Sequence, residues 1–396
     1  MSTTTWTPLC LTPDDVLFFR DGKPSTRGSD HYLRSLFPPY PSTIYGAVRT
    51  RRLLDGGVDL EGLDEANWSR RLNGLQAELG RWGGFGSLAL RGPWLVRGGE
   101  PLLPAPADLG VIPARTSEKE PPRIEVVVRY KPGPTVPPGG GSYPENLALL
   151  QPHGADGGPW LPSAPGVEPR TAAGWLLTPE GLAAWRSGGV PKPDQFVHPS
   201  ALWRDETRTG LGLRTDVRAG EDGQLYTFGF IRLETGVSLG CELAESEMEP
   251  TGRLRLGGEG RSVVVAPGPA FPAATGLPEA SRFTLSFAMP ALSAAGSWPP
   301  GFSEERRNGV LGGIGVTLIG AVVSGFVLVG GWDLARKQAK PLRRALPTGS
   351  VFLFETTDGT PAAEAAARLD GRCFSDFPGD ELARQGFGLA VAGVSR

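Results

Sequence analysis

The stretch QLYTFGFIRLETGVSLGCEL, residues 224–243, decides the fold class. Its β-branched and aromatic residues predict two consecutive strands. The same composition recurs on its C-terminal side in RSVVVAP (261–267), RFTLSFAMP (282–290), SVFLFE (350–355) and GFGLAVAG (386–393). A helical pattern is confined to short segments such as PAAEAAARL (361–369). Strands grouped with a few helices favour an α+β fold with antiparallel sheets over a doubly wound fold.

The length of the chain indicates more than one hydrophobic core. The chain has 396 residues, of which 57 are glycine and 39 proline, and its net charge is -2. We expect an N-terminal domain over 1–110, a Pro/Gly-rich insertion or linker over 111–200 and a C-terminal domain over 201–396. Within the insertion, RIEVVVRY (123–130) predicts a strand and PEGLAAWR (179–186) a short helix. The balanced charge excludes nucleic-acid binding by bulk charge, so any such contact must be local.

The stretch 309–332 carries no charge and is long enough to span a bilayer. Its many glycines and β-branched residues instead favour two buried strands around a turn at Ser324-Gly325. Cys10, Cys241 and Cys373 are odd in number and far apart, and the N-terminus lacks the pattern of a secretory signal. We therefore expect a cytoplasmic protein without a membrane segment.

The first fifty residues predict a strand over 5–19, a basic loop over 20–35 and then a helix. Ser42 or Thr43 is the expected N-cap. The apolar stripe of the helix is expected at Ile44, Ala47, Val48, Arg51 and Leu54, with Arg49 and Arg52 on the opposite face.

The sequence lacks the common catalytic motifs. It has three histidines and neither a GxxxxGK[ST] nor a GxSxG string, so no metal, cofactor or small-molecule substrate is expected. Gly84-Phe-Gly86 and Gly386-Phe-Gly388 lack the third glycine of a dinucleotide-binding turn. His31 is a candidate general base for RNA cleavage, although a lone loop histidine is more often a solvated or hydrogen-bonded residue.

Positive charge is concentrated near the N-terminus, where aromatic residues lie between the basic ones. This combination is typical of single-stranded RNA recognition, and the alternative is a solubilising surface. The basic residues are Arg20, Lys23, Arg27, Arg34, Arg49, Arg51 and Arg52, and the interleaved rings are Phe18, Phe19, His31, Tyr32 and Tyr40. A second cluster holds Arg204, Arg208, Arg214 and Arg218, and a third Arg336, Lys337, Lys340, Arg343 and Arg344.

Six strings in one order resemble the RAMP-superfamily subunit that caps the crRNA 5′ handle in type III-B CRISPR (Cmr) effector complexes. They are LFFRDGKP (17–24), LFPPYPSTIYGAVRTRRL (36–53), RTGLGLRTDVRAGEDGQLYTFGFIRL (208–233), LGGEGRSV (256–263), GGWD…KPLRRALPTGSVFLFE (330–355) and ARQGFGLAVAG (383–393). Only the Pro-rich middle, about 110 to 200, lies outside the resemblance.

The resemblance implies two ferredoxin-like (RRM-like) domains with hairpin insertions, one of them a thumb over the guide RNA, and a C-terminal glycine-rich loop. It implies a non-catalytic subunit that holds the crRNA 5′ handle and docks on a large polymerase/cyclase-like subunit and the first backbone RAMP subunit. The RNA contacts that it implies are Arg20, Arg27, Arg49, Arg52, Gly386, Phe387 and Gly388. Ser42 and Thr43 are further candidates because the N-terminus of a helix aims backbone N–H groups at an anion. Arg208 and Arg214 are candidates from the second basic cluster.

Three alternatives stay open. The chain could be a RAMP-type, metal-independent endoribonuclease that processes precursor crRNA with His31 as base. It could be a bridging subunit that touches RNA little, or the equivalent subunit of a type III-A complex.

Overall fold

The computed structural model describes residues 4–20, 32–114, 120–132, 150–153, 168–213, 220–303, 305–333, 336, 338–376 and 381–395. The chain forms two compact units, each assembled from segments far apart in the sequence. Unit 1 comprises residues 1–99, 202–270 and 328–343, and unit 2 comprises 100–201, 271–327 and 344–396. The two units therefore differ from the expected division of the chain into consecutive segments at residues 110 and 200.

Unit 1 is built on an antiparallel sheet whose strands lie in the order β3-β13-β1-β15-β14. The strands are β1 (Trp6–Pro13), β3 (Ala89–Arg97), β13 (Val237–Ala244), β14 (Gly252–Arg255) and β15 (Ser262–Pro267). Every residue of β13 is buried because it lies between β1 and β3. The unit also contains α2 (Glu65–Arg71), α3 (Gln76–Leu79), β20 (Trp332–Asp333) and β21 (Gln338–Ala339).

Helix α1 (Pro41–Asp55) contacts β3 and β14. It begins at Pro41 with Tyr40 as N-cap, so the expected cap at Ser42 or Thr43 is wrong by two or three residues. Proline fits the first turn because its missing N–H has no helical acceptor there. The expected apolar stripe is also partly wrong, since Arg52 is buried whereas Leu54 is 52% exposed.

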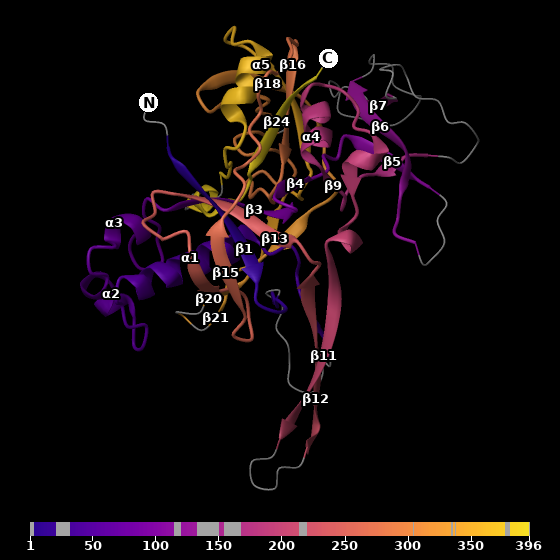
Figure 1. Ribbon diagram of the computed structural model, residues 1–396. Helices are drawn as coiled ribbons and strands as arrows, with labels where there is room; N and C mark the ends of the chain where they lie inside the picture. Colours follow the sequence, from indigo (N-terminus) through magenta and orange to yellow (C-terminus); the bar gives the residue numbers. More distant parts are fainter. Residues whose placement is uncertain are drawn as a thin grey trace. The chain divides into compact units, whose positions relative to one another are not determined.

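A second sheet of unit 1 has the order β11-β12-β2 and consists mainly of one long hairpin. Strands β11 (Trp203–Leu213) and β12 (Gly220–Leu233) pair antiparallel from Trp203 opposite Leu233, and the short β2 (Tyr32–Arg34) adds to β12 in parallel. In Figure 1 the hairpin runs far beyond the β1 and β15 region of its own unit. The two strands predicted in 224–243 are confirmed as the end of β12 and as β13.

Unit 2 is built on an antiparallel sheet in the order β17-β18-β23-β16-β24. Helix α5 (Ala362–Leu369) packs its small buried face on β16, β23 and β24, and phenylalanines fill the core between them. The strands are β16 (Arg282–Phe287), β17 (Asn308–Leu311), β18 (Ile314–Val322), β23 (Val351–Thr356) and β24 (Ala390–Ser395).

The segment expected as an insertion contributes regular structure to unit 2. The strand expected over 123–130 is β6 (Ile124–Pro132), and the short helix is α4 (Pro179–Arg186), which is capped by the Thr178 side chain. The remaining elements are β4 (Glu100–Pro104), β5 (Leu109–Pro113), β7 (Leu150–His153), β8 (Arg170–Thr171), β9 (Leu176–Leu177), β10 (Phe196–Val197), and the short helices Pro193–Gln195, Pro199–Ala201 and Glu381–Gln385.

The uncharged stretch 309–332 was predicted to hold two buried strands, but it covers most of β17, all of β18 and β19 (Val327–Val329) and the start of β20, and β18 and β19 are not a buried pair. β18 joins the sheet of unit 2 between β17 and β23, whereas β19 is outside that sheet. Phe326 is 57% exposed and Leu328 46% exposed, so this end of the stretch is on the surface. The pairing differs because β18 pairs antiparallel with β23, which is distant in sequence, and with β17, which precedes it.

Candidate nucleic-acid interface

The base of the β11-β12 hairpin is anchored by an aromatic cluster. Phe18 lies 5.0 Å from Phe228 and 5.4 Å from Phe230 between ring centroids, and Phe228 and Phe230 are 5.9 Å apart. Val16 is buried with them, and Leu33 of β2 packs against the cluster. One face of the hairpin is therefore closed by the chain that follows β1.

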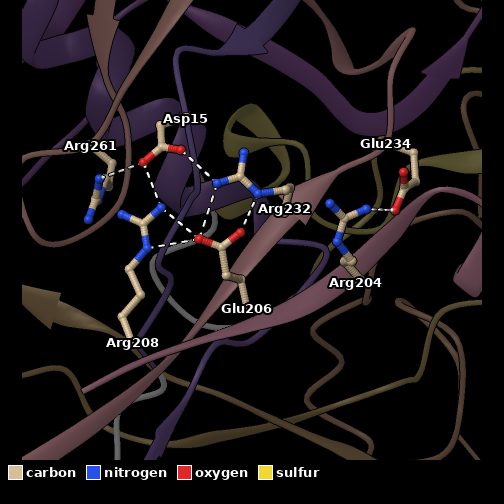
Figure 2. Close-up of polar contacts among 7 residues, drawn as sticks. All are labelled: Asp15, Arg204, Glu206, Arg208, Arg232, Glu234 and Arg261. Carbon is tan, nitrogen blue, oxygen red and sulfur yellow. Dashed lines mark hydrogen bonds and ion pairs between the residues drawn. The ribbon is translucent and has the colours of Figure 1, made fainter.

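Beside the rings, three arginines and two acids form a continuous ion-pair network, shown in Figure 2. Arg208 donates to Asp15 at 2.9 Å and to Glu206 at 2.7 Å. Arg232 donates to Asp15 at 2.8 Å and also pairs with Glu206. Arg261 reaches Asp15 at 3.3 Å, and its guanidinium lies 4.6 Å from the centre of the Phe230 ring. The network joins β11 and β12 to the segment after β1.

The network changes the acidity of its members. Hydrogen bonds from Arg232, opposed by partial burial and reinforced by Arg208, lower the pKa of Glu206 to about 2. The hydrogen bond to Glu206 is the main cause of the raised pKa of Arg208. Glu206 and Arg208 therefore both stay charged at neutral pH. Because the Arg208 charge is shared between two carboxylates, its first role in this structure is to hold the hairpin.

The opposite face of the same three strands is open. Thr207 and Thr209 of β11 are exposed, and so are Tyr32 and Arg34 of β2. Asp205 is exposed nearer the base of the hairpin. The register places Tyr32 beside Thr227 and Arg34 beside Gly229. The two faces of the hairpin thus differ. One is packed and internally ion-paired, and the other presents hydroxyls, one ring, one guanidinium and, nearer the base, the Asp205 carboxylate.

The arginines predicted on α1 point into unit 1. Arg52 is 7% exposed and makes a two-pronged pair with Glu78 at 2.8–3.0 Å, with a further contact to Glu247 at 3.2 Å. Hydrogen bonding to Glu78 raises the pKa of Arg52. Arg49 donates to the Leu79 carbonyl at 2.9 Å, and burial lowers its pKa. Both side chains are therefore bonded within unit 1, which differs from the RNA-facing role expected from the sequence.

Ser42 and Thr43 lie in the first turn of α1 and are half-buried. The Thr43 amide already donates to the Tyr40 carbonyl at 2.9 Å. Neither side chain caps the helix, and the expected contact of their backbone N–H groups with an RNA phosphate stays a prediction.

The Gly386-Phe387-Gly388 turn is part of the interior of unit 2. Phe387 is 1% exposed, which removes its ring from any stacking surface. At Gly388, with φ 65°, a Cβ would lie 1.9 Å from the Phe374 carbonyl oxygen. Its amide donates to the Pro290 carbonyl at 2.8 Å. The glycine therefore permits close approach of protein backbone, and the turn leads the chain into β24.

Three of the predicted site residues, Arg27, His31 and Arg214, lie outside the described residues. Arg20 is exposed at the end of the described segment 4–20. The expected grouping of Arg20 and Arg27 with α1 is therefore neither confirmed nor contradicted.

Asp15, Glu206, Arg232 and Arg261 are important residues that the sequence analysis missed. A signal for one of them, Glu206, was present. In WRDETR the charged residues Arg204, Glu206 and Arg208 alternate, which places them on one strand face. Asp15 is 191 residues away from Glu206 in the chain, and only the fold brings them together.

Within the described part of the chain, no three His, Cys, Asp or Glu side chains are grouped so that they could hold a metal ion. Cys10, Cys241 and Cys373, which all lie within the described residues, form no disulfide. No described helix has the length and apolar character needed to cross a membrane.

Taken together, the structure is a mixed α+β protein built from several antiparallel sheets. The family model described as "CRISPR-associated protein (Cas_Cmr3)" matches residues 9–395. The chain therefore belongs to the Cas_Cmr3 family of CRISPR-associated proteins, and the resemblance to a type III-B (Cmr) subunit is confirmed. No curated protein matches the chain significantly.

Similar solved structures are remote in sequence. A cryo-EM structure of the type III-B Cmr-beta bound to cognate target RNA and AMPPnP matches with a TM-score of 0.47 and 13% identity, over 87% of this chain and 86% of that one. A cryo-EM structure of the type III-B Cmr-beta bound to cognate target RNA matches with a TM-score of 0.47 and 14% identity, again over 87% of this chain and 86% of that one. A crystal structure of a Csm3-Csm4 subcomplex in the type III-A CRISPR-Cas interference complex matches with a TM-score of 0.34 and 10% identity, over 90% of this chain and 97% of that one.

Proposed function

We propose that this protein is a non-catalytic, RNA-binding subunit of a type III-B CRISPR effector complex that binds the 5′ handle of crRNA. The family match across residues 9–395 is the observation that carries the proposal. The subunit would dock on the large polymerase/cyclase-like subunit and on a backbone RAMP subunit in the cytoplasm.

The topology supports a pair of ferredoxin-like units. In chain order, the strands β1, β3, β13 and β15 of unit 1 lie side by side as second, third, first, fourth. The strands β16, β18, β23 and β24 of unit 2 repeat this order. This is the split βαβ arrangement of the ferredoxin-like motif. Unit 1 keeps a helix after the first strand, α1, and unit 2 keeps one before the last strand, α5.

The β11-β12 hairpin is the element that we assign to the thumb over the guide RNA. Its length and its position in the chain, between two strands of unit 1, fit a hairpin inserted into a ferredoxin-like unit. The network of Asp15, Glu206, Arg208 and Arg232 would hold the base of the thumb at a fixed angle while RNA is bound. Arg208 thus supports RNA binding through the position of the hairpin.

Binding of a labelled RNA that carries the repeat-derived 5′ segment tests the proposal. We expect the purified chain to bind this RNA more tightly than a scrambled RNA. The logarithm of affinity should fall with the logarithm of salt by about 0.7 for each phosphate contacted, measured between about 50 and 200 mM salt. Equal affinity for both RNAs, or binding insensitive to salt, would contradict the proposal.

Incubation of the same RNA, and of precursor crRNA, with the chain in EDTA tests the endoribonuclease alternative. We expect intact RNA. Cleavage that disappears in His31→Ala would instead support an enzyme with His31 as base.

A further inference from the structure

Tyr32 differs from the other aromatic residues near the N-terminal basic cluster in being exposed. Phe18 and Phe19 are 2% and 4% exposed, and Tyr40 is half-buried and donates to the Leu328 carbonyl at 3.0 Å. Tyr32 is 42% exposed. Of the described rings in this set, it alone presents a large surface to solvent.

Tyr32 is held against the sheet by the glycine beside it. Tyr32 and Arg34 are two residues apart on β2 and therefore share its outward face, whereas Leu33 packs inward on the aromatic cluster. A Cβ at Gly229 would lie 2.8 Å from the Tyr32 hydroxyl oxygen and 3.4 Å from the adjoining ring carbon. The phenol end of the ring thus lies over Gly229, while much of the residue stays open to solvent.

The surroundings of the ring suit a nucleotide. The Arg34 guanidinium carbon lies 5.6 Å from the centre of the Tyr32 ring, and the hydroxyls of Thr207 and Thr227 are on the same face. The acids Glu206 and Asp15 are on the opposite, packed face of the hairpin. The exposed Asp205 shares the outward face with Thr207, but it lies two residues further toward the base of the hairpin. An aromatic ring on a strand, with a cation beside it, is the arrangement on which unpaired bases stack.

We propose that Tyr32 stacks on one unpaired base of the bound RNA and that Arg34 pairs with an adjacent phosphate, on the outward face of the β11-β12-β2 sheet. This inference rests on the proposed function and deepens it by naming the RNA-contacting residues. The ligand is single-stranded RNA, because a base in a duplex has no free face to stack on the ring.

The test is fluorescence anisotropy with the RNA used above and with a series in which each nucleotide in turn is abasic. Tyr32→Ala should weaken binding of the intact RNA about tenfold, as expected for the loss of one stacked base, and Tyr32→Phe should stay within about twofold. For the one RNA that lacks the stacked base, Tyr32→Ala should cause no further loss. Arg34→Ala should instead lower the salt slope by about 0.7, the value for one phosphate on a single strand.

A matched control is available in unit 2. Phe326 is 57% exposed and has the Arg344 guanidinium 4.8 Å from its ring centre, so it offers the same chemistry at another place. Phe326→Ala should bind RNA as the wild type does. Thermal unfolding of each variant would show that the Tyr32 variants are folded.

The outcomes separate this inference from the proposed function. If the wild type binds the RNA specifically and Tyr32→Ala binds each RNA of the series with the same affinity as the wild type, the proposed stacking site is wrong and the proposed function stands. If Tyr32→Ala loses the same factor of affinity for every RNA of the abasic series, Tyr32 has a structural role, and this result would also overturn the inference. Normal RNA binding with impaired assembly of the effector complex would assign Tyr32 to a protein interface instead. No specific binding by the wild type would overturn both.

Discussion

At the residue scale, the chemical role of each arginine depends on its partner. Arg52 lies on α1 close to two half-buried arginines, Arg49 and Arg51, and Glu78 and Glu247 meet it from other parts of unit 1. Arg51, its neighbour in sequence, pairs with Asp55 one helical turn away at the surface. Removing one partner of a buried ion pair lowers the free energy of unfolding far more than breaking an exposed pair, because water cannot replace the lost partner of the buried charge that remains.

We predict that Arg52→Ala lowers the free energy of unfolding by about 3 kcal/mol, since it leaves the Glu78 carboxylate buried and unpaired. Arg51→Ala is the control and should cost less than about 1 kcal/mol. Urea denaturation of the two variants measures both values. If both variants lose little free energy of unfolding and Arg52→Ala binds RNA more weakly, Arg52 contacts RNA, as expected from the sequence, and this prediction is wrong.

At the element scale, glycine-rich turns set the path of strands without contacting a ligand. The turn before β24 needs Gly388 because the Phe374 carbonyl oxygen occupies the space of a side chain. The turn before α5 needs Gly359 for a different reason, its φ of 83°, and there a Cβ would have nothing within 4 Å. An alanine at Gly359 would carry only the conformational cost of a left-handed backbone, whereas an alanine at Gly388 would carry that cost and a steric clash as well.

Gly359→Ala should therefore destabilise the protein by about 1–2 kcal/mol, the backbone cost alone. Gly388→Ala should cost about 3 kcal/mol or more, because an overpacking cost of about 1–3 kcal/mol is added. The shift of the denaturation midpoint at constant slope measures both. Similar losses for the two variants would show that the turn relaxes away from Phe374.

At the scale of the whole molecule, each unit depends on both halves of the chain. β13, from the second half, lies between β1 and β3 of the first half and pairs with both. A fragment that ends at residue 200 would leave these two strands without their shared neighbour. Long-range pairing of this kind has to form before most of the apolar surface of unit 1 is buried.

We predict that fragments 1–200 and 201–396, expressed separately, do not form unit 1 and that co-expression restores it. Limited proteolysis followed by mass spectrometry of β1, β3 and β13 measures the result. Protection of β1 and β3 in fragment 1–200 alone would contradict the pairing order and would favour the linear domain division.

The amino-acid sequence by itself determined the α+β class, most of the C-terminal strands, the helix α5 and the CRISPR family, because these depend on local alternation, propensity and ordered strings of residues. Only the tertiary structure decided which basic residues are on the surface. Arg49, Arg52 and Arg208 are internally bonded, whereas Tyr32 and Arg34 are open, and no local pattern distinguishes them. The physical reason is that the burial and the charge state of a side chain depend on partners such as Glu78 and Asp15, which folding brings from other segments.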